Sequence, residues 1–483
     1  MKFGARLVPA LLSLTATAYG AAPGITLLRD TTLSANATAV KSYDTNVNIA
    51  SYRHQGILYY SGYQFVAWYN GNARNIIVAR RSFNQDSLAA GTWAWAYVNF
   101  NLAAGADSHN VISLAISPND ARLHVAIGQH DAQLYSIRTN SNAITGAIWD
   151  NTVFGGTASA PATPMAGLPG YPAATNGITY PYFMNAGDPS RTLQFAYRTG
   201  SSGNGVLHLA EYNPSTSSWS YLGQFTAAAG SYTQNGVTST SRNAYPHGFN
   251  YDYGGRLHMA FTWRENLSTQ FIPNCGGSTI NNHDTLYVYS DDRGRTWRNS
   301  AGTAVAKTGT PDLIALSDSG LVVDPLPVGR DLMNQETQIM DRNNLFHAFV
   351  SYVPGRYQAT CATDRSVAQP FHLWRSPSGV WTKVEMKLGG ADVNQGYDRS
   401  KMFFGTANNL FVVLPDLRIV GASAASNWTD WKLIYDGRGL GNYGETIIDY
   451  NLTRVANAVS VVYIKNGSGT TAELHVLDFK TTG

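Results

Sequence analysis

The chain has 483 residues and a formal net charge of +3, and only 13% of its residues are charged, against roughly 25% in average globular proteins. So small a net charge, with no run of Lys or Arg, argues against a nucleic-acid-binding protein. Aromatic residues make up 12%, and Gly, Ser, Thr, Asn and Tyr are abundant, which is typical of a secreted all-β protein with many turns and a carbohydrate-facing surface.

Residues 1–20 predict a signal peptide. Lys2 and Arg6 form its positive region, Leu7 to Leu14 is a short apolar core, and the small residues around Ala18 offer a cleavage site. The apolar run is too short to span a bilayer, and no later segment is long enough either. The alternative is a buried N-terminal helix. We therefore expect a mature chain that begins near Ala21, is secreted to the extracellular space and does not bind a membrane.

Sequons and cysteines fit a secreted chain. Five Asn-x-Ser/Thr sequons predict N-glycosylation at Asn36, Asn266, Asn427, Asn451 and Asn466. The two cysteines, Cys275 and Cys361, are expected to form a disulfide in an oxidising compartment. A zinc site needs more ligands than two cysteines, and no compelling metal constellation stands out, so we predict neither a metal nor a cofactor.

A repeated unit organises the chain: a polar residue, an apolar strand, a Gly/Asn/Asp turn and a second apolar strand. Counting these units gives seven blades at 50–100, 105–155, 178–225, 243–305, 333–390, 395–437 and 442–480. The pattern predicts an all-β fold, a seven-bladed β-propeller of four-stranded antiparallel blades, with residues 24–34 as the candidate strand that closes the ring. Because ring closure removes exposed sheet edges, residues 21–483 are expected to form one domain. We also expect a monomer.

One segment carries a recognisable turn motif. Residues 286–297 read as a strand that runs into an Asp-box, the pattern S-x-D-x-G-x-T-W. In it Asp292 can hydrogen-bond the backbone of a tight turn, Gly294 supplies a permissive backbone, and Trp297 can fill the gap between neighbouring strands. The motif predicts the hairpin between the two outer strands of a blade.

The inner strands of three neighbouring blades begin with unusual residues. Blade two begins Ser108-His109-Asn110, blade three Thr179-Tyr180-Pro181 and blade four Ala244-Tyr245-Pro246. The second strands of the same blades end near His130, Arg198 and Arg264, at offsets of equal parity from Leu123, Leu193 and Leu257, which places the three on one face of their strands. We expect these side chains to gather at one mouth of the central channel.

Each of these residues also has an ordinary structural interpretation. A strand-end His is often only a hydrogen-bonding residue, a Tyr before Pro often packs a turn, and an Arg in a β-protein often pairs with a surface carboxylate. His283, in Asn282-His283-Asp284, either reaches the site or caps its strand.

With these motifs the chain resembles the polysaccharide lyases built on neuraminidase-type repeats. The resemblance rests on Tyr63 to Tyr69 with Arg74, Arg80 and Arg81, on Ser108 to Ser113, on Tyr180 to Phe183, on Tyr197-Arg198 with the Gly-rich run after it, on Ala244 to Glu265, and on Asn282 to Trp297. It covers residues 50–300 closely and the remainder loosely. Where the family often has two adjacent His in blade two, this chain has Gln129 before His130.

The resemblance implies a seven-bladed propeller that cleaves a uronate polysaccharide by β-elimination. Catalytic residues would be His109, His130, Tyr180, Arg198 and Tyr245, with Arg198 neutralising the substrate carboxylate. Arg264, Asn110, Arg53 and His283 are the candidate substrate-binding residues. The division of base from acid among His109, His130 and Tyr180 stays open.

The family's activities suggest a partner and a substrate, an acidic polysaccharide with glucuronate, cleaved at rhamnose–glucuronate linkages such as those of gum arabic arabinogalactan. Three alternatives remain open: an ulvan lyase, an exo-sialidase-like glycosidase in which Arg53, Arg198 and Arg264 form an arginine triad, and a non-catalytic carbohydrate-binding propeller.

Overall fold

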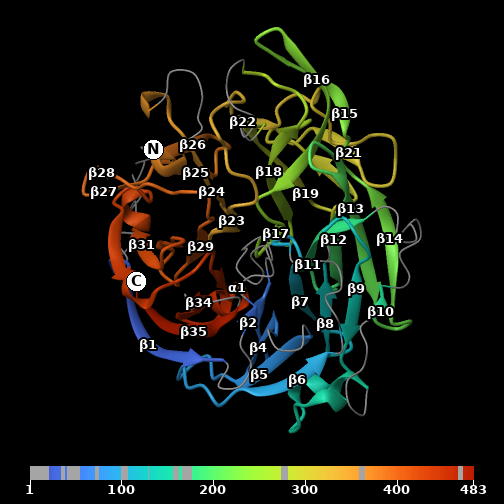
Figure 1. The fold of residues 1–483 in the computed structure, drawn as a ribbon, viewed down its shortest axis with the longest axis vertical. Helices are drawn as coiled ribbons and strands as arrows, with labels where there is room; N and C mark the ends of the chain where they lie inside the picture. The colour runs from blue at the N-terminus through green and yellow to red at the C-terminus, as the bar shows by residue number, and fades with distance from the viewer. Residues whose placement is uncertain are drawn as a thin grey trace, which may run out of the picture.

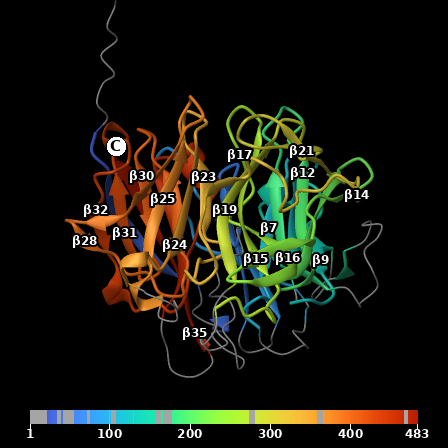
Figure 2. The same cartoon turned by 90° about the horizontal axis from the view of Figure 1, so that it is seen from above.

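The structure is a computed structural model that describes residues 21–33, 39–40, 55–70, 75–98, 100, 107–128, 130–155, 163–165, 177–272, 281–357, 365–465 and 471–482. Its sheets stand side by side around a ring, and the chain passes around that ring once (Figure 1). From the side, the strands run between the two faces of the ring (Figure 2). This is the predicted all-β propeller of antiparallel blades, most of which have four strands.

The first three blades are four-stranded sheets of consecutive strands. Their strands are β3 (Ile57–Tyr60), β4 (Tyr63–Tyr69), β5 (Ile76–Ser82) and β6 (Ala94–Val98); β7 (Ile112–Ser117), β8 (Arg122–Ile127), β9 (Tyr135–Arg138) and β10 (Thr163–Pro164); and β11 (Ile178–Asn185), β12 (Leu193–Ser201), β13 (Asn204–Asn213) and β14 (Ser218–Gln224). In the second and third of these blades, the first strand lies nearest the centre of the ring and the last lies outermost (Figure 1).

Blade four is larger than predicted. Its eight strands are β15 (Ala229–Gln234), β16 (Val237–Pro246), β17 (Asn250–Tyr251), β18 (Leu257–Glu265), β19 (Asn282–Ser290), β20 (Thr296–Arg298), β21 (Ala304–Lys307) and β22 (Val322–Asp324). The extra hairpin β15–β16 forms because Asn235 and Gly236 both have positive φ, 52° and 78°, which is the backbone of a two-residue hairpin turn.

Blades five and six return to four strands, and a small hairpin separates them. Their strands are β23 (Thr337–Met340), β24 (Phe346–Tyr352), β25 (Gln369–Arg375) and β26 (Trp381–Glu385); the hairpin β27 (Lys387–Leu388) and β28 (Ala391–Asp392); and β29 (Lys401–Phe404), β30 (Leu410–Val413), β31 (Arg418–Ala422) and β32 (Lys432–Asp436).

The ring closes with a sheet built from both ends of the chain. β33 (Ile447–Ile448), β34 (Ala458–Lys465) and β35 (Thr471–Thr482) are completed by β1 (Gly24–Thr32), which pairs antiparallel with β35, while β2 (Ala39–Val40) also pairs with β35. The predicted closing strand at 24–34 is therefore present. Six blades consist of consecutive strands alone, so the predicted count of seven is reached only when this closing sheet is counted as a blade.

Helices are few and short in the described part of the chain. They are the α-helix α1 (Tyr450–Val455) and the 3-10 helices η1 (Ala143–Thr145), η2 (Asn151–Phe154), η3 (Gly355–Tyr357), η4 (Arg365–Val367), η5 (Ala424–Ser426) and η6 (Arg438–Leu440). No described helix has the length and apolarity that crossing a bilayer requires.

The Asp-box takes the predicted form between β19 and β20. The Asp292 carboxylate accepts hydrogen bonds from the Thr296 backbone N–H and the Ser290 hydroxyl, both at 2.7 Å. Gly294 has φ 80°, and a Cβ there would lie 2.6 Å from Leu209 of blade three. Trp297 is fully buried and packs between blades three and four, so the motif joins two neighbouring blades.

Candidate active site

The predicted residues come together on one face of the ring, where inner strands begin and second strands end. His109 lies just before β7 and His130 just after β8, in blade two. Tyr180 is on β11 and Arg198 on β12, where Thr179 pairs with Arg198. In blade four, Tyr245 on β16 and Arg264 on β18 occupy the corresponding ends, since Asn243 pairs with Arg264.

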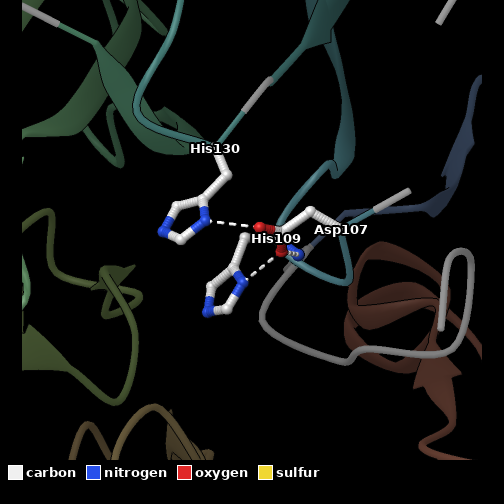
Figure 3. A group of neighbouring side chains, drawn as sticks. All are labelled: Asp107, His109 and His130. Atoms are coloured by element: carbon white, nitrogen blue, oxygen red, sulfur yellow. Dashed lines mark hydrogen bonds and ion pairs between the residues drawn. The ribbon is translucent and has the colours of Figure 1, made fainter. Parts of the chain in front are cut away.

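The two histidines share one carboxylate. Nδ1 of His109 lies 2.5 Å from Oδ1 of Asp107, and Nδ1 of His130 lies 2.6 Å from Oδ2 of Asp107. The rings stack with centroids 4.0 Å apart at 14°. Figure 3 shows the carboxylate between the two Nδ1 atoms, with both second ring nitrogens turned away from it to the same side. Asp107 thus sets the orientation of both imidazoles.

This arrangement fixes the tautomer of neutral His109. Burial alone would raise the pKa of Asp107, but hydrogen bonds from His109 and His130 lower it well below its usual range. Burial lowers the pKa of His109, and the bond to Asp107 offsets this only in part. A neutral His109 that donates Nδ1–H to a carboxylate carries its lone pair on Nε2, as a general base requires.

Tyr180 sits on a local distortion of its strand. Its φ is 59°, and the β11–β12 register shifts between Thr179 and Tyr182. A bulge of this kind re-aims a side chain that would otherwise follow the strand alternation. The Tyr180 ring lies between those of His109 and Tyr245, with centroids 5.8 and 5.9 Å away, so it links the imidazoles to the arginines of the site.

Arg198 lies beneath the two tyrosines. Its Cζ is 5.0 Å from the ring centroid of Tyr180, and its Nη1 donates to the Tyr245 hydroxyl at 3.2 Å. Nη2 donates to the Thr179 hydroxyl at 3.2 Å, while Nε is buried without a hydrogen-bond partner among the described residues. Only 1% of Arg198 is exposed, so its guanidinium lies almost completely within the protein.

Arg264 is the more accessible guanidinium and is held on three sides. Its Nε donates to Oδ1 of Asn282 at 2.8 Å, Nη1 to Ser202 at 3.2 Å and Nη2 to Oδ1 of Asn334 at 2.9 Å. The Ser202 hydroxyl lies 3.0 Å from that of Tyr245. The second guanidinium is therefore fixed next to the same phenol that Arg198 contacts.

Tyr245 is a perturbed acid. Burial alone would raise the pKa of Tyr245, but the charges of Arg264 and Arg198 outweigh it and lower the pKa to about 8. Its phenol therefore loses a proton far more easily than an ordinary tyrosine, which suits proton transfer near neutral pH.

Among the described residues, Asp107, His109 and His130 form the one group whose ligand atoms lie close enough together to hold a metal ion. One ligand atom from each of Asp107, His109 and His130 lies within 4.8 Å of the others. The Nδ1 atoms of both histidines already face the Asp107 carboxylate, so the geometry fits two oriented imidazoles better than three ligands around a cation.

The remaining predicted residues have mixed placements. Asn110 is buried and its Oδ1 accepts from the His130 backbone N–H at 2.8 Å, so it positions the histidine. His283 is fully buried, stacked on Tyr232, with its ring nitrogens 2.9 and 3.1 Å from Asp284 and Glu265. This corrects its assignment as a substrate-binding residue, since neither nitrogen is left for a ligand. Arg53 lies outside the described residues.

Three of the five predicted glycosylation sites lie among the described residues. Asn427 is exposed, Asn266 is half-buried with Nδ2 bonded to Ser241, and Asn451 is half-buried with Nδ2 bonded to the Tyr59 carbonyl. Four predicted modification positions and the signal segment lie outside the described residues: Asn36, Asn466, Cys275, Cys361 and residues 1–20.

Comparison with known proteins adds a family and a fold. The model of the BNR repeat-containing family matches residues 63–387. The polysaccharide lyase Uly1 is similar in structure at a TM-score of 0.68 and 15% identity, over 94% of this chain and 99% of that one. An ulvan lyase of a polysaccharide lyase family termed PL25, solved bound to -[GlcA(1-4)Rha3S]-, is similar at a TM-score of 0.58 and 10% identity, over 94% of each chain. No curated protein matches.

Proposed function

The chain belongs to the BNR repeat-containing family, and from that premise and the site geometry we propose that it is a polysaccharide lyase that cleaves a glucuronate-containing chain by β-elimination. One observation carries the proposal: an imidazole pair oriented by Asp107 beside a tyrosine–arginine group on one face of the ring. The fold similarity to two polysaccharide lyases supports it.

The proposed reaction needs a cation, a base and an acid from the protein. The C5–H bond of a uronate breaks, its electrons form the C4=C5 double bond, the C4–O4 bond breaks, and O4 takes up a proton. A cation must first neutralise the carboxylate, because C5–H is otherwise very weakly acidic. A base then removes the C5 proton and an acid protonates O4.

The geometry suggests how these roles divide. Nε2 of neutral His109 suits the base, with His130 beside it as a second imidazole on the same carboxylate. Tyr245, with its lowered pKa, suits the proton donor to O4, and Tyr180 lies between donor and base. In glucuronate H5 and O4 lie on the same side of the ring, so a base and an acid on one wall of the site can act together.

The substrate is proposed as a polymer with rhamnose–glucuronate linkages, either arabinogalactan of the gum arabic type or ulvan. The glucuronate–rhamnose ligand of the PL25 ulvan lyase is compatible with both. Secretion is proposed with it, from the segment at 1–20.

A far-UV assay tests the proposal directly. Purified protein is incubated separately with gum arabic and with ulvan, and absorbance of the conjugated unsaturated uronate is followed. A rise in absorbance with either polymer supports a lyase and identifies which of the two is its substrate. Release of sugars without absorbance would point to a hydrolase, and binding without any product would point to a carbohydrate-binding propeller.

A further inference from the structure

A polar cavity in blade six opens on the same face as the candidate active site. It has a volume of about 270 Å³, and its walls come from the segment before β29, the β30–β31 turn and the segment before β33. These are the strand ends that in blades two to four carry the imidazole, tyrosine and arginine groups. The walls include Asn394, Gln395, Asp398, Asp416, Arg418 and Asn442.

The lining chemistry suits a hydroxyl-rich ligand without a negative charge. Amides donate to and accept from hydroxyls, carboxylates accept from them, and few side chains in the walls are apolar. Asn394 and Asp398 present such groups at exposed positions, whereas the amide N–H groups of Gln395 and Asn442 bond within the protein. Among the described wall residues the one cation, Arg418, is paired with Asp416 at 2.7 Å. The charge of Asp398 then disfavours a second carboxylate, so a uronate is a poor occupant and a neutral sugar a good one.

An exposed tyrosine stands next to this cavity. Tyr397 lies between two wall residues, Gly396 and Asp398, and 58% of it is exposed, which is unusual for a large ring. The buried Arg365 lies under it, with Cζ 5.7 Å from the ring centroid. One face of the ring is thereby supported and the other is left to a ligand, and aromatic faces pack well against the apolar face of a sugar.

A hydrogen-bonded bridge connects this region with the candidate active site. Asn334 accepts from Arg264 through its side chain, at 2.9 Å, and from Nε of Arg399 through its backbone carbonyl, at 2.7 Å. Arg399 in turn is paired with Glu445 at 2.7 Å. These bonds link the site to the segments that border the cavity, on the same face of the ring.

We infer that Tyr397 and the blade-six cavity form a distal subsite that binds a neutral sugar residue of the polysaccharide, several units from the cleaved bond. The inference rests on the proposed lyase function. The chain would cross this face from blades three and four, over Asn334 and Arg399, to blade six. The subsite contributes to polymer binding and not to bond cleavage.

Steady-state kinetics of Tyr397→Ala and Asp398→Ala test this subsite. For the polymer, KM should rise about tenfold in Tyr397→Ala, equivalent to the loss of about 1.4 kcal/mol, with kcat unchanged. For the shortest oligosaccharide that is still cleaved, both constants should match the parent. Tyr97→Ala, which removes a tyrosine of 38% exposure from the outer strand β6, is the matched control and should change neither.

A carboxyl-reduced polymer separates this inference from the proposed function. Reduction turns each glucuronate into a neutral sugar that cannot be eliminated. The reduced polymer should still bind the parent protein and lose about tenfold in affinity with Tyr397→Ala. Unchanged binding and polymer KM in both variants would overturn the subsite while leaving lyase activity intact. Binding that depends on Tyr397 in a protein without lyase activity would overturn the proposed function and keep the sugar site.

Discussion

At the scale of single residues, the site depends on how one carboxylate and two arginines tune their neighbours. Asp107 fixes both imidazoles, while Arg198 and Arg264 make Tyr245 unusually acidic. These effects act through side chains, so one substitution can remove each of them while the ring stays intact.

Asp107→Asn should lower kcat about 10²-fold, because an amide can accept from at most one imidazole and no longer stabilises an imidazolium. His109→Ala and His130→Ala should each lose at least as much, while binding of an unreactive substrate analogue survives better than turnover. Turnover and analogue binding are measured side by side. Parental kcat in Asp107→Asn would show that the shared carboxylate has no part in the reaction.

Arg198→Lys should lose most activity and keep its fold. Lys preserves the charge but not the planar fork that contacts Thr179 and Tyr245. Circular dichroism checks the fold, and the far-UV assay checks turnover. A variant that works at the parental rate would remove Arg198 from the carboxylate-neutralising role and leave Arg264, which is more accessible, as the candidate.

The rate should follow a bell-shaped pH profile. Activity rises with pH as His109 becomes neutral, and since its pKa is lowered, this limb lies below pH 6.5. Activity falls as Tyr245, whose pKa is about 8, loses the proton it should donate. Profiles of kcat/KM, which report the pKa values of the free enzyme, are measured for the parent and Tyr245→Phe. A rate that keeps rising through this second pKa would instead identify Tyr245 as the base.

At the scale of strands and turns, short local motifs join the blades and orient a site residue. The Asp-box joins blades three and four, and the bulge at Tyr180 turns a strand residue toward the site. The Asp-box turn lies outside the candidate site, so its effect on stability can be separated from catalysis.

Asp292→Ala should destabilise the protein by about 1–2 kcal/mol, because the Thr296 N–H and the Ser290 hydroxyl lose their acceptor. The kinetic constants of the folded enzyme should stay at parental values, since the turn is not part of the candidate site. Urea unfolding measures the first effect. Asp291→Ala, on the adjacent exposed carboxylate, is the control and should cost much less.

Strand patterns and turn residues predict most blades, because inner and second strands repeat with the same polarity. The repeat pattern alone does not predict the β15–β16 hairpin, although Asn235-Gly236 is a strong turn signal. Asp107 escapes prediction because a lone Asp two residues before a His forms no recognisable motif, and only folding brings it against His130. The assignment of His283 is wrong because the sequence does not reveal that two carboxylates hold it in a buried position.

At the scale of the whole molecule, closure of the ring depends on contacts between blade one and the closing sheet. Arg81 on β5 donates to Asp478 on β35 at 2.6 Å, and both side chains are almost completely buried. Ser460 donates to the same carboxylate at 2.6 Å. A buried ion pair therefore joins blade one to the closing sheet, at the seam where the ring closes.

Arg81→Met should destabilise the protein by about 3–5 kcal/mol, because Asp478 is left as a buried charge without its main partner. The double variant Arg81→Met, Asp478→Leu should recover most of that loss, since both charges are then absent. Thermal or urea unfolding of the two variants gives the comparison. Equal instability in both would show that packing at the seam, and not the unpaired charge, determines closure.

The seam also has a consequence for how the protein is made. β1 leaves the ribosome more than 400 residues before β35, the strand with which it pairs in the closing sheet. At translation rates of about 5–20 residues per second, the interval is on the order of tens of seconds. During that time the growing blades present open strand edges, which are prone to pair with other chains. Aggregation and the need for chaperones during expression should therefore depend on how soon the closing sheet forms, and not on the blades that contain the candidate site.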